Sequence, residues 1–348
     1  MNHWFTVIRV KIKTTFPEWR CAASLLTMVF CLSGCGLLSR FSDPEPRFDI
    51  QAHRGGRGLA PENTLAAFRQ AMELGADTLE TDLAMTRDRV LILSHDPYLN
   101  PAFVRGPDGK WLSGKGPSIF SMSLEELANY DIGRLNPANP YGRNFPSQKP
   151  ADGERFPSLA QLFALAGASG KNFRFNLETK ITPGAPGETP DPELFARALV
   201  DAIRAAGLER RASIQSFDWR TLVHAKRIAP EIRTVCLTIE AAGMSTVSTN
   251  PEQASPWHAG YKLSDHDGVM PAMVKAAGCE VWSMFWRNLT PQLFAQAKSY
   301  GLLVIPWTVN ETHDMLALIA LGVDGLITDY PDRLIEVMNI SGKTLRPK

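Results

Sequence analysis

Three acidic side chains occur where two short apolar strands are expected. Glu80 and Asp82 stand two residues apart in TLETD, and Glu178 stands two residues before Lys180 in NLETK. Alternate residues of a strand point to the same face, so each pair shares a face. Three carboxylates at neighbouring strand ends repel one another unless a cation lies between them. Oxygen donors suit Ca²⁺ or Mg²⁺, and the pattern predicts one divalent cation held by Glu80, Asp82 and Glu178.

A second interpretation needs no metal. Lys180 could form a structural salt bridge with one of the glutamates. That interpretation leaves Asp82 and two nearby histidines without a role, so the metal site is favoured.

The first expected strand ends in the polar sequence HRGG. Imidazole and guanidinium are costly to bury without partners, so His53 and Arg54 are expected to meet a ligand or a charge. The following glycines let the backbone approach a ligand closely. The stretch PEN predicts that a helix begins near Pro61, while Glu62 and Asn63 either cap it or support the histidine.

A second histidine returns toward the carboxylates. The strand that carries Glu80 continues to Thr86, turns, and runs back through apolar residues to His95. A two-residue hairpin turn would place His95 opposite Glu80. Two imidazoles beside a divalent cation would supply an acid and a base near neutral pH. Arg54 and Lys180 would then bind the oxygens of a phosphate.

Strand and helix patterns alternate from residue 48 onward. Eight apolar segments read as strands, and between them lie segments with apolar residues at helical spacing, several of which end in glycine. This alternation predicts a (β/α)8 TIM barrel, with a doubly wound sheet as the alternative. The strand candidates are DIQAH, DTLETD, FRFNLE, SIQSF, IRTVCL, EVWSMF, LVIPWT and GLIT. In a barrel, chemistry is expected at the carboxyl ends of the strands.

Two segments interrupt the alternation, besides the expected β-hairpin extension after the second strand. A stretch at about 97–157 is rich in Pro, Gly and Asn, which predicts a long irregular insertion with one short helix at SLEELANY. A second stretch, about 240–267, contains Trp257, His258 and Tyr261. Each segment either shapes access to the site or forms a structural cap.

The first residues differ from the rest. Basic residues precede an apolar run of about half the length that a membrane span requires, which is typical of a secretory signal. The run ends in LSGC, which resembles the lipobox of bacterial lipoproteins and predicts diacylation of Cys35. We therefore expect a lipoprotein signal peptide at 1–34, a tether at 35–47 and one domain at 48–340. A short uncleaved anchor is the alternative.

Membrane attachment through lipidated Cys35 would make the chain a bacterial membrane lipoprotein. Gly36 after this cysteine, in place of aspartate, resembles lipoproteins that are passed to the outer membrane. The leaflet that it would occupy is left open.

The charge balance excludes one class of partner. The chain has 37 basic and 36 acidic residues, so no electrostatic footprint for nucleic acid is present. No protein partner can be identified. Apart from Cys35 and the two cysteines of the signal segment, only Cys236 and Cys279 remain. We expect them to stay unpaired, because one lies late in its strand and the other opens the next strand.

The ordered motifs resemble those of the glycerophosphodiester phosphodiesterase family. They run from about 51 to 331 and comprise HRG, PENT, the E-T-D pair, the HD return, LETK, SF, WTVN and GLITDYP. The resemblance implies a (β/α)8 barrel that hydrolyses glycerophosphodiesters, such as glycerophosphocholine, to glycerol 3-phosphate and an alcohol. It also implies one divalent cation as cofactor.

Roles can also be expected for single residues. From its position before Thr308 at a strand end, Trp307 either forms a wall against the glycerol or packs the barrel. The nucleophile is water or a neighbouring hydroxyl of the substrate. The roles implied by the matched motifs are acid and base for His53 and His95, metal ligands for Glu80, Asp82 and Glu178, and phosphate contacts for Arg54 and Lys180.

Two rival functions stay open. A related phosphodiesterase could act on lysophospholipids or phosphoinositides, which an apolar groove between the two long loops would favour. A lipid-anchored protein could instead bind phosphodiesters without turnover, but such a protein would be free to lose catalytic groups and all seven are present here.

Overall fold

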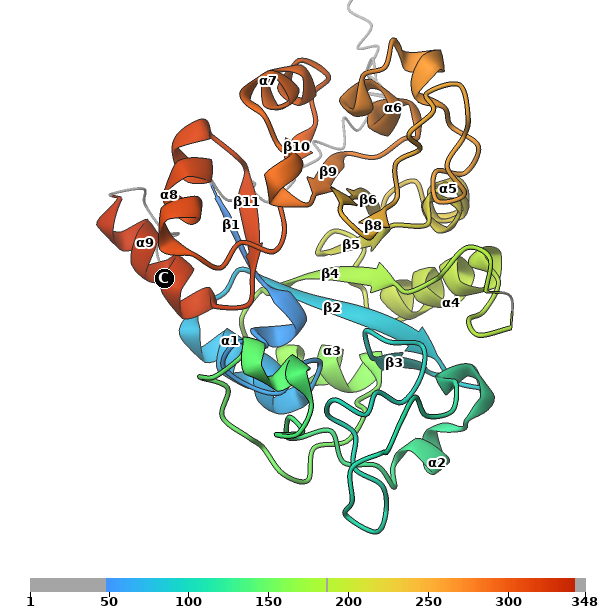
Figure 1. Ribbon diagram of the computed structural model, residues 1–348, viewed down its shortest axis with the longest axis vertical. Coiled ribbons are helices and arrows are strands. Elements are labelled where there is room, and N and C mark those ends of the chain that lie inside the picture. The colour runs from blue at the N-terminus through green and yellow to red at the C-terminus, as the bar shows by residue number, and fades with distance from the viewer. Residues whose placement is uncertain (1–47, 186, 342–348) are drawn as a thin grey trace, which may run out of the picture. The chain divides into compact units, whose positions relative to one another are not determined.

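A computed structural model of the protein describes residues 48–185 and 187–341, shown in Figure 1. The predicted signal segment, Cys35 and the tether lie outside the described residues. Eight parallel strands follow the order β10, β9, β6, β5, β4, β2, β1, β11. They are β1 (Asp49–Ala52), β2 (Thr78–Met85), β4 (Arg174–Thr179), β5 (Ala212–Ser216), β6 (Arg233–Thr238), β9 (Val281–Met284), β10 (Leu303–Val304) and β11 (Gly325–Thr328). The prediction of eight strands in a (β/α)8 barrel is confirmed.

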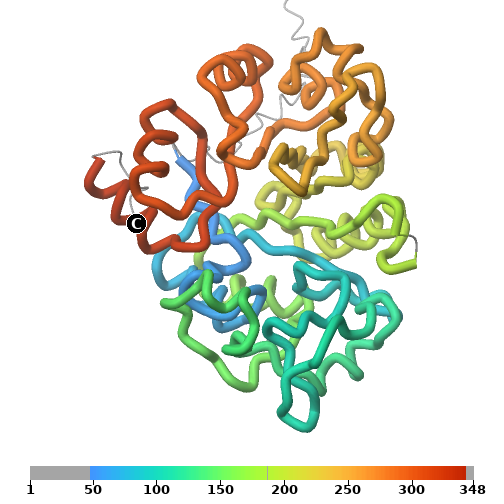
Figure 2. The backbone as a smooth tube through the Cα atoms, viewed as in Figure 1, coloured from blue at the N-terminus to red at the C-terminus, as the bar shows by residue number. Residues whose placement is uncertain are grey.

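The two ends of this strand order meet through backbone hydrogen bonds. Asp324 N donates to Val304 O at 2.9 Å, and Ile327 N donates to Pro306 O at 3.0 Å. At the other side of β11, Ala52 of β1 pairs with Thr328. Figure 2 shows the red C-terminal segment beside the blue segment that contains β1. The last strand is therefore placed next to the first, at the edge where His53 leaves β1.

Helices follow the strands as the sequence predicts. They are α1 (Leu65–Leu74), α3 (Leu159–Ala168), α4 (Pro192–Ala205), α5 (Trp219–Ile228), α6 (Met270–Ala276), α7 (Pro291–Ser299), α8 (Thr312–Leu321) and α9 (Pro331–Ile340). Polar caps define many of their starts; the side chain of Asp191 accepts from Glu193 N, and that of Thr290 accepts from Leu293 N. Helix α9 was not among the predicted helices.

The first of these helices corrects a prediction. α1 begins at Leu65 rather than near Pro61, because Asn63 has a positive φ of 56°, which breaks a helical path. The side chain of Thr64 caps the helix by accepting a hydrogen bond from Ala67 N at 3.1 Å. Glu62 and Asn63 are consequently left free to point elsewhere.

The predicted hairpin after the second strand is present, but its register differs. β3 (Leu91–Leu93) pairs antiparallel with β2, with Leu83 opposite Leu93. This register puts His95 in line with Thr81, not with Glu80. The turn contains a third residue, Arg89, whose φ of 64° closes a bulged turn instead of a two-residue one. The extra residue shifts every pair by one position.

The long insertion has a small core of its own. Its apolar side chains pack on Ala84 of β2 and Ile92 of β3 and include Phe103, Ile119 and Leu127. Its regular structure is one short helix, α2 (Leu124–Leu127), besides single helical turns. The prediction of an irregular segment with one short helix at 123–130 thus agrees with the structure.

The second long loop contains a two-stranded hairpin, β7 (Glu240–Ala241) and β8 (Met244–Ser245). His258 of this loop is buried and its ring stacks on Trp219 of α5, with centroids 4.3 Å apart.

Within residues 48–185 and 187–341, no helix is long and apolar enough to cross a membrane.

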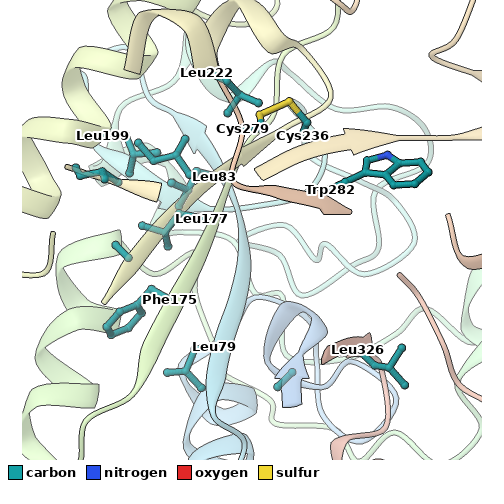
Figure 3. Packing of buried hydrophobic residues seen from close by; sticks show 14 of the residues in the cluster. Leu79, Leu83, Phe175, Leu177, Leu199, Leu222, Cys236, Cys279, Trp282 and Leu326 are labelled. Carbon is teal, nitrogen blue, oxygen red and sulfur yellow. A yellow bond between two sulfur atoms is a disulfide. The ribbon is translucent and has the colours of Figure 1, made fainter. Parts of the chain in front are cut away.

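A disulfide joins β6 to the connection that precedes β9, which contradicts the expectation that both cysteines stay unpaired. The Cα atoms of Cys236 and Cys279 lie 5.9 Å apart, within the range of a disulfide. β9 begins only at Val281, so Cys279 lies on the connection from α6 and not in line with the strand. The prediction that the two cysteines lie too far apart assumed that each lies in line with its strand. It therefore does not apply to Cys279. Figure 3 shows the disulfide among the buried apolar side chains, near Leu222 of α5.

Candidate active site

Three buried carboxylates meet at the carboxyl end of the barrel. Glu80 and Asp82 come from β2 and Glu178 from β4, and one oxygen of each lies within 4.8 Å of the others. Asp82 and Glu178 are register partners on neighbouring parallel strands. The predicted cluster is therefore assembled by two strands that share a face pattern.

Amides fix the orientation of the deepest carboxylate. Gln215 of β5 donates to Glu80 Oε1 at 2.6 Å, and the backbone N of Arg54 donates to Glu80 Oε2 at 2.8 Å. Asn176 in turn donates to Gln215 Oε1 at 2.9 Å. This layer of amides forms a polar floor below the site.

Asn63 orients the second carboxylate. Its amide N donates to Asp82 Oδ2 at 3.1 Å, while its amide oxygen accepts from the hydroxyl of Thr81 at 2.8 Å. The other oxygen, Asp82 Oδ1, is buried and has no hydrogen-bond partner among the described residues. A buried, oriented carboxylate oxygen without a hydrogen bond is what a metal ligand requires.

Arg54 sits at a strained turn directly after β1, with a φ of 53°. Its Nη1 donates to Glu62 Oε1 at 2.7 Å, and its Nε forms an ion pair with Asp82 Oδ2 at 3.1 Å. Glu62 therefore holds the arginine, and it neither caps α1 nor supports His53. Asn63 likewise serves Asp82, so both alternatives suggested by the sequence were wrong for these two residues.

Lys180 lies on the opposite side of the cluster. Its Nζ donates to Glu178 Oε1 at 2.6 Å and is 3.6 Å from Asp82 Oδ1. Burial alone would lower the pKa of Lys180, but the carboxylates of Glu178 and Asp82 raise it. The lysine therefore keeps its charge, and the salt bridge considered from the sequence is present beside the carboxylate cluster.

The positive charges of Arg54 and Lys180 do not fully offset the negative charge of the three carboxylates. Burial and the neighbouring charges of Asp82 and Glu178 raise the pKa of Glu80 well above its usual range. Burial also raises the pKa of Glu178 to about 7. For Asp82, burial is outweighed by Arg54, and its pKa falls well below the ordinary value. An additional cation would let all three groups ionise together, so the donor set fits a divalent metal ion.

His53 is held by a carboxylate from the far end of the chain. Its Nδ1 lies 2.6 Å from Asp329 Oδ1, and the same oxygen accepts from Arg57 Nε at 2.7 Å. Burial alone would raise the pKa of Asp329, but Arg57 and His53 lower it, so the group is a carboxylate. His53 therefore donates through Nδ1, which leaves the lone pair on Nε2.

Burial also sets the proton affinity of this imidazole. Burial and the positive charge of Arg57 lower the pKa of His53 to about 4, against the opposing effect of Asp329. A histidine with this pKa is neutral at pH 7 and can accept a proton.

His95 has a corresponding partner beside it in the chain. Its Nδ1 lies 3.1 Å from Asp96 Oδ1, and Asp96 also accepts from the side chain of Asn100. Burial and the charge of Arg54 lower the pKa of His95. Either imidazole, when protonated, would lower the pKa of Asp82, so both imidazoles lie near the carboxylate cluster despite the shifted register.

Trp307 is half-buried in an aromatic cluster next to the site. Its ring centroid lies 5.4 Å from that of Phe217 and 5.9 Å from that of Phe285. Its indole N donates to Ser283 O at 3.3 Å. Packing of the barrel end thus accounts for its position, and contact with substrate stays a prediction.

Sequence reasoning missed several residues of the site. Asp329 lies within the GLITDYP motif, which was recognised without a role for its aspartate. Asp96 stands within the HD return, directly after His95. A search for a carboxylate partner of each histidine could have found both. Arg57, which bonds to Asp329, carries no signal of comparable strength in one sequence.

Comparisons with known proteins identify relatives of this chain. The model of the glycerophosphoryl diester phosphodiesterase family matches residues 53–333. A protein of Caldanaerobacter subterraneus named glycerophosphodiester phosphodiesterase is 31% identical over 299 residues, which cover 84% of this chain and 98% of that protein. A rat protein named lysophospholipase D GDPD1 is 22% identical over 302 residues, or 83% of this chain and 85% of that protein.

A solved structure shows the same fold. The crystal structure of a candidate glycerophosphoryl diester phosphodiesterase from Silicibacter pomeroyi has a TM-score of 0.75 and 32% identity. The match covers 85% of this chain and 95% of that chain.

Proposed function

Because this chain belongs to the glycerophosphoryl diester phosphodiesterase family, we propose a specific mechanism for it: metal-dependent hydrolysis with two histidines as acid and base. The enzyme class itself, a glycerophosphodiester phosphodiesterase, follows from the family match and the relatives. The products are glycerol 3-phosphate and an alcohol. The observation that carries the mechanism is the cluster of Glu80, Asp82 and Glu178, with two carboxylate-paired histidines near Asp82.

The cation is assigned to the three carboxylates. Asp82 Oδ1, which lacks a hydrogen bond, and the raised pKa values of Glu80 and Glu178 support this assignment. All the donors are oxygens, which favours Ca²⁺ or Mg²⁺. When bound, such an ion polarises a phosphoryl oxygen as a Lewis acid.

Arg54 and Lys180 bind the phosphate of the substrate. Each is fixed by carboxylates of the site, Arg54 by Glu62 and Asp82, and Lys180 by Glu178. Arginine has five donors and lysine three, so both keep donors for the nonbridging oxygens. Their fixed charges stabilise the negative charge that develops in the transition state.

The two histidines exchange protons with the reacting groups. His53 takes a proton from the nucleophile, because its Nδ1–H is committed to Asp329 and its low pKa makes Nε2 a free acceptor. His95, after taking up a proton from solvent, gives that proton to the leaving alcohol. Its side chain is 32% exposed against 10% for His53, so it is better placed to exchange protons with solvent.

The test is release of glycerol 3-phosphate from glycerophosphocholine by the purified full chain. The assay is run in calcium, in magnesium and in EDTA, beside His53→Ala and Glu178→Gln. We expect turnover that EDTA and both substitutions abolish, and the preferred ion identifies the cofactor. Turnover that persists in EDTA contradicts the metal assignment. A wild type that binds calcium but leaves several head groups intact favours the anchored binding protein instead.

A second substrate class is favoured by the aromatic cluster. Trp257, Phe285 and Trp307 are half-buried around Phe217, from the second long loop and two strand ends. One relative is named for lysophospholipase D activity. Lysophosphatidylcholine and glycerophosphocholine assayed side by side distinguish the two substrates, since an apolar contact would favour the acylated one.

The lipid anchor is a further proposal. The LSGC sequence supports diacylation of Cys35, and two acyl chains give stable attachment where one does not. A bacterial host expressing the full chain or Cys35→Ala is labelled with radioactive palmitate and fractionated. Label in the outer-membrane fraction that the substitution removes supports the anchor, whereas label-free wild type contradicts it.

A further inference from the structure

The insertion returns to the active site and bonds to the loop that follows β1. Lys149 N donates to Leu59 O at 2.9 Å, and the side chain of Gln148 donates to Arg57 O at 2.7 Å. The ring of Phe145 lies under the guanidinium of Arg57, with the two centres 4.9 Å apart. This end of the insertion is therefore fixed to the segment that carries His53 and Arg54.

Within this contact, the hydroxyl of Tyr141 lies between two charged groups. It accepts from Arg57 Nη1 at 3.0 Å and donates to Glu62 Oε2. Burial alone would raise the pKa of Glu62, but Arg54 and Arg57 lower it, so Glu62 is a carboxylate and the tyrosine must be the donor. The hydroxyl thus donates its proton to the negative Glu62 and accepts, through a lone pair, from the positive Arg57.

Each of these two charges leads to a different catalytic group. Glu62 holds Arg54 at 2.7 Å, and Arg54 touches Asp82. Arg57 holds Asp329 at 2.7 Å, and Asp329 holds His53. One hydroxyl therefore links the residue proposed to bind phosphate with the residue proposed to accept the proton.

The insertion fixes the ring that carries this hydroxyl. The Tyr141 ring meets Phe145 at 5.3 Å and Phe103 at 6.4 Å between centroids. Its backbone N is bonded to the side chain of Asn139 at 3.0 Å. The aromatic contacts come from the insertion, so the position of the hydroxyl depends on how the insertion folds.

We infer that Tyr141 is a positioning residue for the phosphodiesterase reaction, through which the insertion sets the orientation of Arg54 and Arg57. It acts through its two hydrogen-bond partners, Glu62 and Arg57, and does not itself touch the three carboxylates. The inference rests on the proposed function, since it gives the insertion a part in the same reaction.

The first test compares Tyr141→Phe with a matched control, Tyr130→Phe. Tyr130 also packs on the insertion core, and its hydroxyl has no hydrogen-bond partner among the described residues. Removing the Tyr141 hydroxyl should lower kcat by about 10- to 100-fold, the usual effect of losing a group that orients catalytic residues. Tyr130→Phe should stay close to the wild type. The dissociation constant for Ca²⁺ or Mg²⁺ should change less than about twofold in both variants.

The second test is a double-mutant cycle with Glu62→Gln. If Tyr141 acts through Glu62, adding Tyr141→Phe to Glu62→Gln should cost far less than it costs the wild type, whereas independent roles give additive losses. Melting temperatures of all variants are measured alongside. A merely structural tyrosine would lower the melting temperature and leave kcat intact below it.

The outcomes separate the two levels of the claim. Normal kcat in Tyr141→Phe, or additive losses in the cycle, overturns the inference while the proposed function stands. No turnover by the wild type overturns the proposed function and the inference together, and a loss of kcat in Tyr130→Phe as large as that in Tyr141→Phe overturns the inference alone.

Discussion

The two histidines of the site have the same partner chemistry but very different surroundings. His53 bonds to Asp329, which lies 276 residues away and is brought to it by closure of the barrel. His95 bonds to its own neighbour, Asp96, on the hairpin that leads into the insertion. The first pair shares its carboxylate with Arg57 and is buried, whereas the second is partly exposed.

This difference matches the two proposed roles, in which the buried histidine accepts a proton and the more accessible one donates it. The His53–Asp329 pair is fixed by β1, β11 and the arginine, so its tautomer is set by three parts of the fold. The His95–Asp96 pair depends on local chain geometry and on Asn100. We therefore expect removing the carboxylate of the buried pair to be more costly than removing the carboxylate of the partly exposed pair.

Removing either imidazole gives the largest expected effect. His53→Ala and His95→Ala should each lower kcat by about 10²- to 10⁴-fold, as expected for the loss of a general acid or base. A phosphodiester of glycerol with p-nitrophenol has a leaving group that needs no proton. This substrate should restore much of the rate to His95→Ala only. Equal restoration of both variants contradicts the division of roles.

Loss of the buried carboxylate comes next. In Asp329→Asn the amide can donate to Nδ1, which moves the ring proton to Nε2 and removes the free lone pair. We expect kcat to fall about 100-fold, within the range for groups that orient a catalytic residue. The melting temperature is recorded too, because Arg57 loses an ion pair. A normal kcat would show that the tautomer of His53 does not matter.

The carboxylate of the partly exposed pair should matter less. Asp96→Asn is expected to lower kcat by no more than about 10-fold, because water can replace a partner at the partly exposed ring of His95. Assays of Asp96→Asn and Asp329→Asn under the same conditions give the ratio of their kcat values directly. A larger loss for Asp96→Asn reverses the comparison.

The disulfide tests stability away from both pairs. It closes a sequence separation of 43 residues between β6 and the connection that precedes β9. Replacing Cys236 and Cys279 by alanine should lower the free energy of unfolding by about 2 to 4 kcal/mol. Denaturant unfolding measures this loss, and kcat at 25 °C should stay unchanged. A parallel loss of kcat would mean that the site and this side of the barrel are coupled.

A third buried histidine, His258, can be compared with His53 and His95, because no carboxylate partner in the part of the chain that the structure describes offsets the effect of burial on its pKa. His258 is 2% exposed, its Nε2 has no hydrogen-bond partner among the described residues, and burial lowers its pKa to about 4. The unfolded chain binds the proton more tightly, so stability is lost as pH falls from about 6.5 to about 4.

The matched variant is His258→Phe, which keeps a ring against Trp219 and removes the titration. Relative to this variant, the wild type should lose about 2 to 3 kcal/mol between pH 7 and pH 4.5. Urea unfolding at several pH values measures the difference. A constant gap between the two proteins across this range contradicts the assignment.

The sequence was informative where the pattern is local. Alternating strands and helices predicted the barrel, and the spacing of Glu80, Asp82 and Glu178 predicted the carboxylate cluster, because two-residue periodicity fixes faces within one strand. The register of the hairpin failed, since one residue at positive φ, Arg89, shifts every pair.

Long-range partners could not be derived in the same way. Asp329 reaches His53 only once the barrel closes, and Tyr141 reaches Glu62 only once the insertion folds. The disulfide was missed for a related reason: Cys279 lies on a connection whose path the strand pattern does not determine.

Direct binding of the cation tests the central claim most directly. Metal-free full chain is titrated with Ca²⁺ and with Mg²⁺ by isothermal titration calorimetry, beside Asp82→Asn and Glu178→Gln. The account predicts one ion per chain for the wild type and binding weakened at least about tenfold in both variants. A wild type that binds no ion yet turns over glycerophosphocholine in EDTA would contradict it.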